Sequence, residues 1–94
     1  MAYADDDVNW VYDRTGGRCF YCGIQLSFRN YAAVGEKGAW EIDHFIPVAS
    51  NGAHQPYNWV PACVSCNTEK SDLLPYEYDP NRFERGDRDP DNYV

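Results

Sequence analysis

The chain has 94 residues, of which 44% are hydrophobic and 16% aromatic, and its formal net charge at pH 7 is −7. This composition excludes an intrinsically disordered chain, and no apolar run reaches the roughly 18 residues of a transmembrane helix, so we expect no membrane association. A domain of this size buries only a modest core, so we expect a bound metal or disulfides to stabilise it.

The negative charge opposes binding to a phosphate backbone. It is unevenly distributed, however: residues 14–75 carry five acids and five bases, and the excess acids lie in residues 1–13 and 76–94. The formally neutral middle of the chain therefore leaves a nucleic-acid partner open. The acidic N-terminus lacks the apolar stretch of a signal peptide, which predicts a cytoplasmic protein.

The first predicted element is a short helix over residues 8–14, capped by the aspartates at positions 5–7 and ended by Gly16 and Gly17. We place Trp10 and Val11 on its inner side. Residues 24–37 are predicted to be largely irregular.

A β-hairpin is predicted next. Residues 39–46 are rich in β-forming side chains and end at Pro47, and residues 57–60 form the return strand. A helix over residues 67–73, ended by Pro75, follows the hairpin. Residues 1–78 are therefore predicted to form the domain, and residues 79–94 to form an acidic C-terminal tail or a surface wrap.

Four cysteines form two Cys-x-x-Cys pairs, Cys19 with Cys22 and Cys63 with Cys66, separated by 40 residues. Each such turn points two thiolates to one side, and two turns complete a tetrahedral structural zinc site. In a reducing compartment, paired cysteines more often bind metal than form disulfides. Disulfides, redox chemistry and a rubredoxin-like iron site are the alternatives.

A second group of polar residues lies between and beside these pairs. Asp43 and His44 are adjacent at the end of a predicted strand, and Asn58, Asn67 and Lys70 follow. Histidine is suited to deprotonating water near pH 7. Adjacent strand residues point to opposite faces, so Asp43 and His44 can share a site only if the strand distorts or the substrate straddles its edge.

Together these elements resemble the HNH endonuclease family, which has the ββα-metal (His-Me finger) fold. The matching elements are Cys19-x-x-Cys22, Ile42-Asp43-His44-Phe45-Ile46-Pro47, Gly52, Asn58-Trp59 and Cys63-x-x-Cys66-Asn67-x-x-Lys70. The resemblance implies a small α+β domain, with its motifs inside residues 19–73, braced by the four-cysteine zinc site.

The resemblance also implies roles for single residues. Asp43 and Asn67 would hold a catalytic divalent cation, His44 would be the general base, and Asn58 would tether the hairpin loop. Family members often have histidine where this chain has Asn67. The amide oxygen favours Mg²⁺ or Mn²⁺ over Zn²⁺.

The predicted function is cleavage of phosphodiester bonds, in double-stranded DNA by resemblance, although nothing in the residues excludes RNA. No base-reading element is apparent, which predicts low sequence specificity or a separate targeting protein. Lys70 is predicted either to contact a phosphate or to lie on a solvated helix face, and His54 to be a loop residue. The alternative is a non-catalytic zinc module that binds a protein or nucleic acid.

Overall fold

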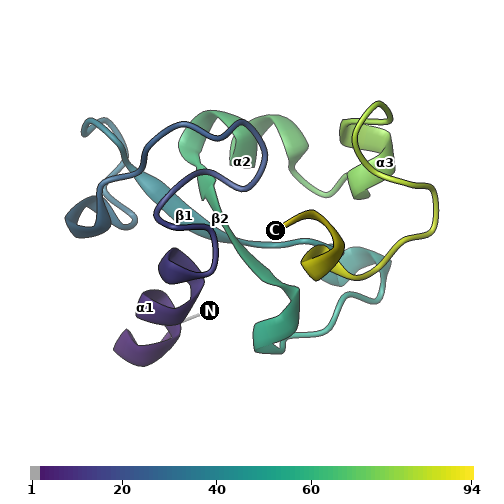
Figure 1. The fold of residues 1–94 in the computed structure, drawn as a ribbon, viewed down its shortest axis with the longest axis horizontal. Helices are drawn as coiled ribbons and strands as arrows, with labels where there is room; N and C mark the ends of the chain where they lie inside the picture. Colours follow the sequence, from purple (N-terminus) through teal and green to yellow (C-terminus); the bar gives the residue numbers. More distant parts are fainter. Residues whose placement is uncertain (1–2) are drawn as a thin grey trace.

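The computed structural model describes residues 3–94 and shows two antiparallel strands packed against helices (Figure 1). β1 (Trp40–His44) pairs with β2 (Trp59–Cys63), so that His44 lies opposite Trp59. α1 (Asp5–Asp13) contacts β2, and α2 (Val64–Lys70) follows β2 directly and contacts both strands. The predicted α+β class, with a hairpin followed by a helix, is confirmed.

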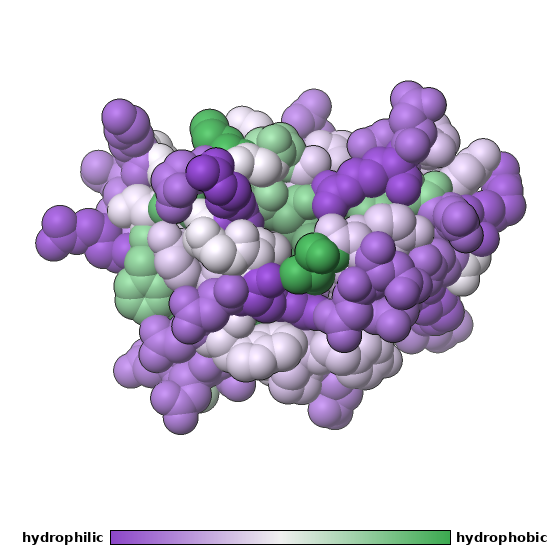
Figure 2. Space-filling model, in the orientation of Figure 1, coloured by the Kyte–Doolittle hydropathy of each residue, from purple (hydrophilic) through white to green (hydrophobic). Residues whose placement is uncertain are grey.

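The other elements are short. They are α3 (Pro75–Tyr78) and the 3-10 turns η1 (Phe28–Asn30), η2 (Val48–Ser50), η3 (Pro56–Asn58) and η4 (Pro90–Tyr93). On the face seen in Figure 2, hydrophilic residues predominate and apolar residues are exposed in small, separate groups. Across residues 3–94, every helix is too short or too polar to cross a bilayer.

α1 begins earlier than predicted. The aspartates at positions 5–7 form its first turn instead of capping it, and the Asp7 carboxylate accepts the backbone N–H of Ala4 at 3.2 Å. Acids in this position interact favourably with the positive end of the helix dipole. Val11 is fully buried as predicted, but Trp10 is 45% exposed, and its ring contacts the Arg14 guanidinium at 4.7 Å. The prediction that Trp10 faces the core is wrong.

β1 ends earlier than predicted: the N–H of Phe45 still donates to the carbonyl of Asn58 at 2.8 Å, but a side chain replaces the backbone partner at Ile46. The amide of Asn58 accepts the N–H of Ile46 at 2.9 Å and donates to the carbonyl of Ile46 at 3.0 Å. β2 in turn extends further than predicted and includes Pro61, which lies opposite Ile42. Proline is tolerated in a two-stranded sheet because each strand has an unpaired edge.

α2 begins at Val64, before the predicted start at residue 67. Cys63 is its N-cap residue, because its sulfur accepts the backbone N–H of Cys66 at 3.4 Å. The second Cys-x-x-Cys pair is therefore part of the helix start. Ser71, with φ of 47°, ends the helix before the predicted Leu73, which is 40% exposed, and Pro75 begins α3.

The segment over residues 79–94 packs onto the domain, and in the view of Figure 1 its end lies beside β2, on the side toward α3. Phe83 is only 2% exposed and stacks on Phe20 with ring centroids 5.9 Å apart. Asp91 forms a 2.5 Å ion pair with Arg14, which has a mostly buried side chain. Arg82 donates hydrogen bonds to the carbonyl groups of residues 20, 21 and 93. This acidic segment is therefore integrated into the fold.

We expect Phe83→Ala to destabilise the whole domain by about 3–5 kcal/mol, because it leaves a cavity in the aromatic core. Urea unfolding followed by circular dichroism measures the change. Val94→Ala is the matched control, because Val94 lies in the same segment but is 59% exposed, and it should cost less than about 0.5 kcal/mol. Equal stabilities for the two variants would show that the packing of Phe83 does not stabilise the domain.

Candidate metal and catalytic site

The four cysteines meet at the junction of β2 and α2. The ligand atoms of Cys19, Cys22, Cys63 and Cys66 all lie within 4.8 Å of one another, and no disulfide joins these four cysteines. The sulfurs of Cys22 and Cys63 are 3.8 Å apart. Tetrahedral zinc with Zn–S bonds of about 2.3 Å requires sulfur separations of about 3.8 Å. The cluster therefore has the composition and size of a four-sulfur zinc site, as predicted from the spacing.

Backbone hydrogen bonds shape this cluster. The N–H of Gly23 donates to the carbonyl of Cys19 at 2.9 Å, which closes the first turn, and Gly23 has a φ of 79° that glycine adopts without strain. The N–H of Cys63 donates to the sulfur of Cys19 at 3.3 Å. This hydrogen bond from a backbone N–H to a sulfur connects the second cysteine pair directly to the first.

The thiols differ in acidity. Burial raises the pKa of Cys63 and of Cys66, so their thiolates need a nearby positive charge. Burial also opposes ionisation of Cys19, but hydrogen bonds from the backbone N–H groups of residues 63, 22 and 21 outweigh it and lower the pKa of Cys19. A divalent cation would supply the charge that four neighbouring thiolates require.

A separate pocket of about 380 Å³ lies where β1 ends. Its lining includes Asp43, His44 and Asn67, together with Ser71 and Asp72. Two predicted site residues come from the last positions of β1 and the third from α2. The structure therefore brings to one pocket the three residues to which the family resemblance assigns the chemistry.

Asp43 is held firmly in this pocket. It is 7% exposed, and its Oδ2 atom accepts a hydrogen bond from the Tyr21 hydroxyl and lies 3.1 Å from the Lys70 ammonium. Burial raises the pKa of Asp43, while Lys70 and the Tyr21 hydroxyl oppose that change. Burial and the Asp43 charge raise the pKa of Tyr21 well above its usual range, so Tyr21 stays a donor. The contacts at Oδ2 leave Oδ1 as the oxygen for a cation.

Lys70 differs from its prediction. It is fully buried, pairs with Asp43 and donates to the carbonyl of His44 at 3.0 Å. The helix face that carries it is turned inward, against β1, so its ammonium is not on a solvated surface and is already bonded within the protein. Lys70 therefore positions Asp43 and the end of β1 in this structure instead of facing a phosphate.

His44 and Asp43 point to different neighbours, as the alternation of a strand requires. Asp43 turns toward Tyr21 and α2, whereas His44 turns toward the following loop, where its Nε2 atom lies 3.0 Å from Nδ1 of His54. Both still line the pocket because β1 ends at His44. Burial, and then the charges of His54 and Lys70, lower the pKa of His44. The pocket therefore extends around the end of β1 and is lined by side chains from both faces of the strand.

Asn67 is oriented by a neighbour that the sequence did not identify as a partner. Its side-chain nitrogen donates to Oε2 of Glu41 at 2.9 Å. Because this bond uses the nitrogen of the amide, the side-chain oxygen is the atom left for a cation. Asp43 and Asn67 together thus offer two oxygen donors, which is the chemistry that Mg²⁺ and Mn²⁺ prefer.

Asn58 ties the hairpin loop together, as the resemblance implies. It is 1% exposed, bonds both backbone groups of Ile46 and donates to the carbonyl of Ala53 at 2.9 Å. Gly52 lies in the same loop, where an added Cβ would come within 1.7 Å of the Ile46 carbonyl oxygen. This close approach explains why the loop needs glycine at position 52.

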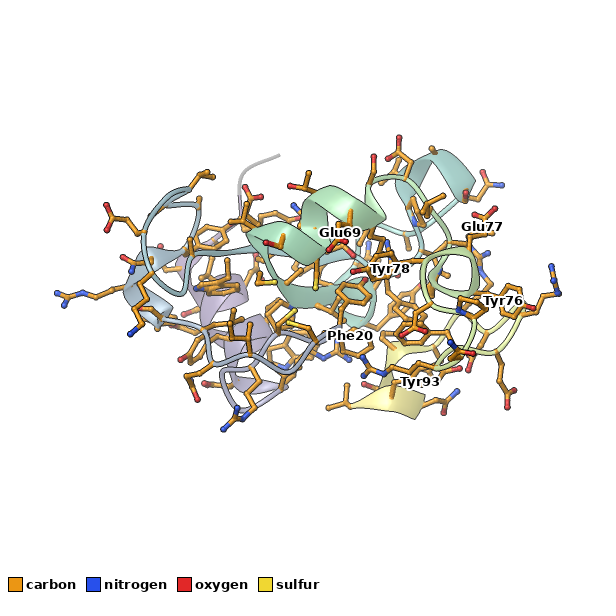
Figure 3. All side chains as sticks on the ribbon, turned by 90° about the horizontal axis from the view of Figure 1, so that it is seen from above. Phe20, Glu69, Tyr76, Glu77, Tyr78 and Tyr93 are labelled. Atoms are coloured by element: carbon orange, nitrogen blue, oxygen red, sulfur yellow. The ribbon has the colours of Figure 1, made fainter. Side chains whose placement is uncertain are left out.

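Sequence reasoning missed three residues that contact the predicted site: Tyr21, Glu41 and His54. Tyr21 lies inside the first Cys-x-x-Cys turn, and its ring packs edge-on against Tyr78 with centroids 5.5 Å apart. In the view of Figure 3, Tyr78 and Phe20 lie between α2 and Tyr93 of the C-terminal segment. The position of Glu41 two residues before Asp43, on the same side of the strand, was the available signal for its contact with α2.

Comparisons with known proteins agree with this geometry. A sequence model of the HNH endonuclease family matches residues 19–73, which is more than half of the chain and includes both cysteine pairs and the pocket residues. In fold, the chain is similar to the crystal structure of the Type II-C Cas9 enzyme from Actinomyces naeslundii, with a TM-score of 0.63 and 20% sequence identity. That match covers 86% of this chain and 8% of the Cas9 chain. The protein belongs to the HNH endonuclease family.

Proposed function

We propose that this protein is a metal-dependent endonuclease that hydrolyses phosphodiester bonds in DNA. His44 is the general base, and Asp43 and Asn67 hold one divalent cation. The observation that carries this proposal is the pocket at the end of β1, which these three side chains line together. Membership of the HNH endonuclease family supports the reaction class.

The proposed step is a displacement at phosphorus. The imidazole of His44 takes a proton from a water molecule, and the water oxygen forms a bond to phosphorus. The bond from phosphorus to the 3′ oxygen breaks, and that oxygen takes up a proton from solvent, leaving a 5′-phosphate and a 3′-hydroxyl. Because its pKa is lowered, His44 is neutral and able to accept the proton at neutral pH.

The oxygen donors of Asp43 and Asn67 fit Mg²⁺ or Mn²⁺, which would stabilise negative charge on the phosphate and on the leaving oxygen. Tyr21 and Lys70 fix the Asp43 carboxylate, and Glu41 fixes the Asn67 amide. Two protein ligands leave the remaining positions to water and substrate. The cysteine cluster is assigned a structural zinc ion, because four sulfurs complete its coordination shell.

Double-stranded DNA is the proposed substrate, by family membership. The net charge of −7 weakens non-specific attraction to it, so substrate binding depends on the cation or on a protein partner that delivers the DNA. The same charge favours a second candidate, a zinc module without catalytic activity that binds another protein. That candidate requires no cation at the Asp43 pocket.

We expect His44→Ala to reduce cleavage of supercoiled plasmid by at least about 100-fold in the presence of Mg²⁺ or Mn²⁺, because it removes the general base. Gel analysis of nicked and linear products measures the rate, with EDTA as a metal-free control. Zinc content and the unfolding temperature should match the wild type, which separates loss of chemistry from loss of fold. Wild-type rates in the variant would contradict the mechanism.

The acid limb of the pH–rate profile should have its midpoint below about pH 6.5, which is the ordinary pKa of histidine. Because the pKa of His44 is lowered, His44 stays neutral and able to accept a proton at lower pH than a free histidine. Activity is therefore retained above the midpoint and lost below it. Single-turnover cleavage at fixed metal concentration gives the profile, with circular dichroism as the check on folding. A midpoint above 6.5 would contradict this assignment of the base.

Cys22→Ser should abolish stoichiometric zinc binding and lower the unfolding temperature strongly, because a structural zinc site contributes directly to folding. Cys22 is exposed, so the change removes a ligand without opening a cavity. Ser65→Ala, at an exposed position within the second cysteine pair, is the matched control. Elemental analysis and thermal unfolding measure the two effects. Iron in place of zinc, or disulfide-linked cysteines in freshly purified protein, would overturn the assignment.

A further inference from the structure

His54 lies outside the elements that carry the family resemblance, yet it contacts the proposed general base. It stands in the loop between η2 and η3, and its Nδ1 atom is 3.0 Å from Nε2 of His44. The two ring centroids are 5.3 Å apart, with planes inclined by 35°. The contact therefore joins the two imidazoles edge to edge through one nitrogen of each.

The position of the His54 ring is fixed although the residue is exposed. Its ring lies against Trp59, with centroids 5.0 Å apart, and against Tyr3 at 5.6 Å. The preceding residue, Ala53, is anchored through its carbonyl by the buried side chain of Asn58 at 2.9 Å. The loop tether therefore also determines where His54 stands relative to His44.

A neutral imidazole has one protonated and one unprotonated nitrogen, so two neutral rings in this contact share one proton. If Nδ1 of His54 donates, Nδ1 of His44 is protonated and cannot accept a proton from water. If Nε2 of His44 donates, Nδ1 of His44 carries a free lone pair. Only the second arrangement makes His44 a base, and it requires His54 to be the acceptor.

We propose that His54 is a positioning residue that holds His44 in the tautomer protonated at Nε2, so that Nδ1 of His44 receives the proton of the attacking water. His54 accepts the Nε2–H bond both before and after this transfer. The role of Nδ1 in catalysis rests on the proposed nuclease function, whereas the tautomer is a property of the protein without substrate.

Two substitutions separate the hydrogen bond from ring packing. His54→Phe keeps a ring against Trp59 and removes the acceptor, whereas His54→Asn loses the ring but keeps a side-chain oxygen near the Nδ1 position. We expect His54→Phe to lower kcat by about 10- to 100-fold without changing KM, and His54→Asn to recover most of that loss. Gln55→Ala, at the neighbouring exposed position, is the control and should match the wild type.

Nitrogen-15 NMR of the histidine rings tests the tautomer directly, in the zinc-loaded 94-residue chain at a pH where both rings are neutral. We expect His44 to be protonated at Nε2 in the wild type and in His54→Asn, and to become a mixture of tautomers in His54→Phe. This readout does not depend on cleavage, so it decides the tautomer even if the wild type cuts no DNA.

His44 protonated at Nδ1 in the wild type would overturn the proposal. It is also overturned if His54→Phe retains the wild-type tautomer and rate. A slow His54→Asn beside a fast His54→Phe would overturn it as well, because packing of the ring at position 54, and not its hydrogen bond, would then determine the rate. A wild type with the Nε2–H tautomer and no nuclease activity would refute the nuclease function but leave the positioning of His44 by His54 intact.

Discussion

The convergence of four sulfurs at the junction of β2 and α2 determines where the rest of the site lies. Cys63 ends β2, and Cys66 lies in the first turn of α2, so the cluster fixes the angle between the strand and the helix that carries Asn67. Residues 19–22 bring Tyr21 to the carboxylate of Asp43. The cysteine cluster and the pocket at the end of β1 are therefore structurally connected, because the first cysteine pair places Tyr21 against Asp43 and the second pair directly precedes Asn67, which lines the pocket.

The position of Asp43 in the pocket depends on a buried ion pair with Lys70. Lys70 is fully buried and offsets the charge of Asp43, and breaking such a pair by removing one partner typically costs about 3–5 kcal/mol. Because Lys70 also bonds the carbonyl of His44, the same ammonium holds both the Asp43 carboxylate and the backbone of His44. Under the proposed function, this would orient the carboxylate before a cation binds, which would reduce the reorganisation that binding requires.

The sequence predicted the cysteine cluster from residue type and spacing, and the resemblance of its motifs to the HNH endonuclease family implied the grouping of Asp43, His44 and Asn67. It failed where tertiary contacts decide the outcome. Trp10 lies outward because Val8 and Val11 fill the inner face of α1, and Lys70 is buried where its ammonium bonds the Asp43 carboxylate and the carbonyl of His44. The partnership of His54 with His44 depends on how the Asn58-tethered loop folds back, and no local pattern encodes that.

Internal contacts also account for several of the eight basic residues, and this bears on how DNA would be held. Arg14 is paired with Asp91, Lys70 with Asp43, and the guanidinium of Arg82 with backbone carbonyls. Because these cations serve the fold, the charge available to a phosphate backbone is smaller than the composition suggests. Under the proposed function, the cation at the pocket would add attraction for a single phosphate. Such a site would not select a sequence by itself, so the choice of target would fall to whatever holds the DNA in place.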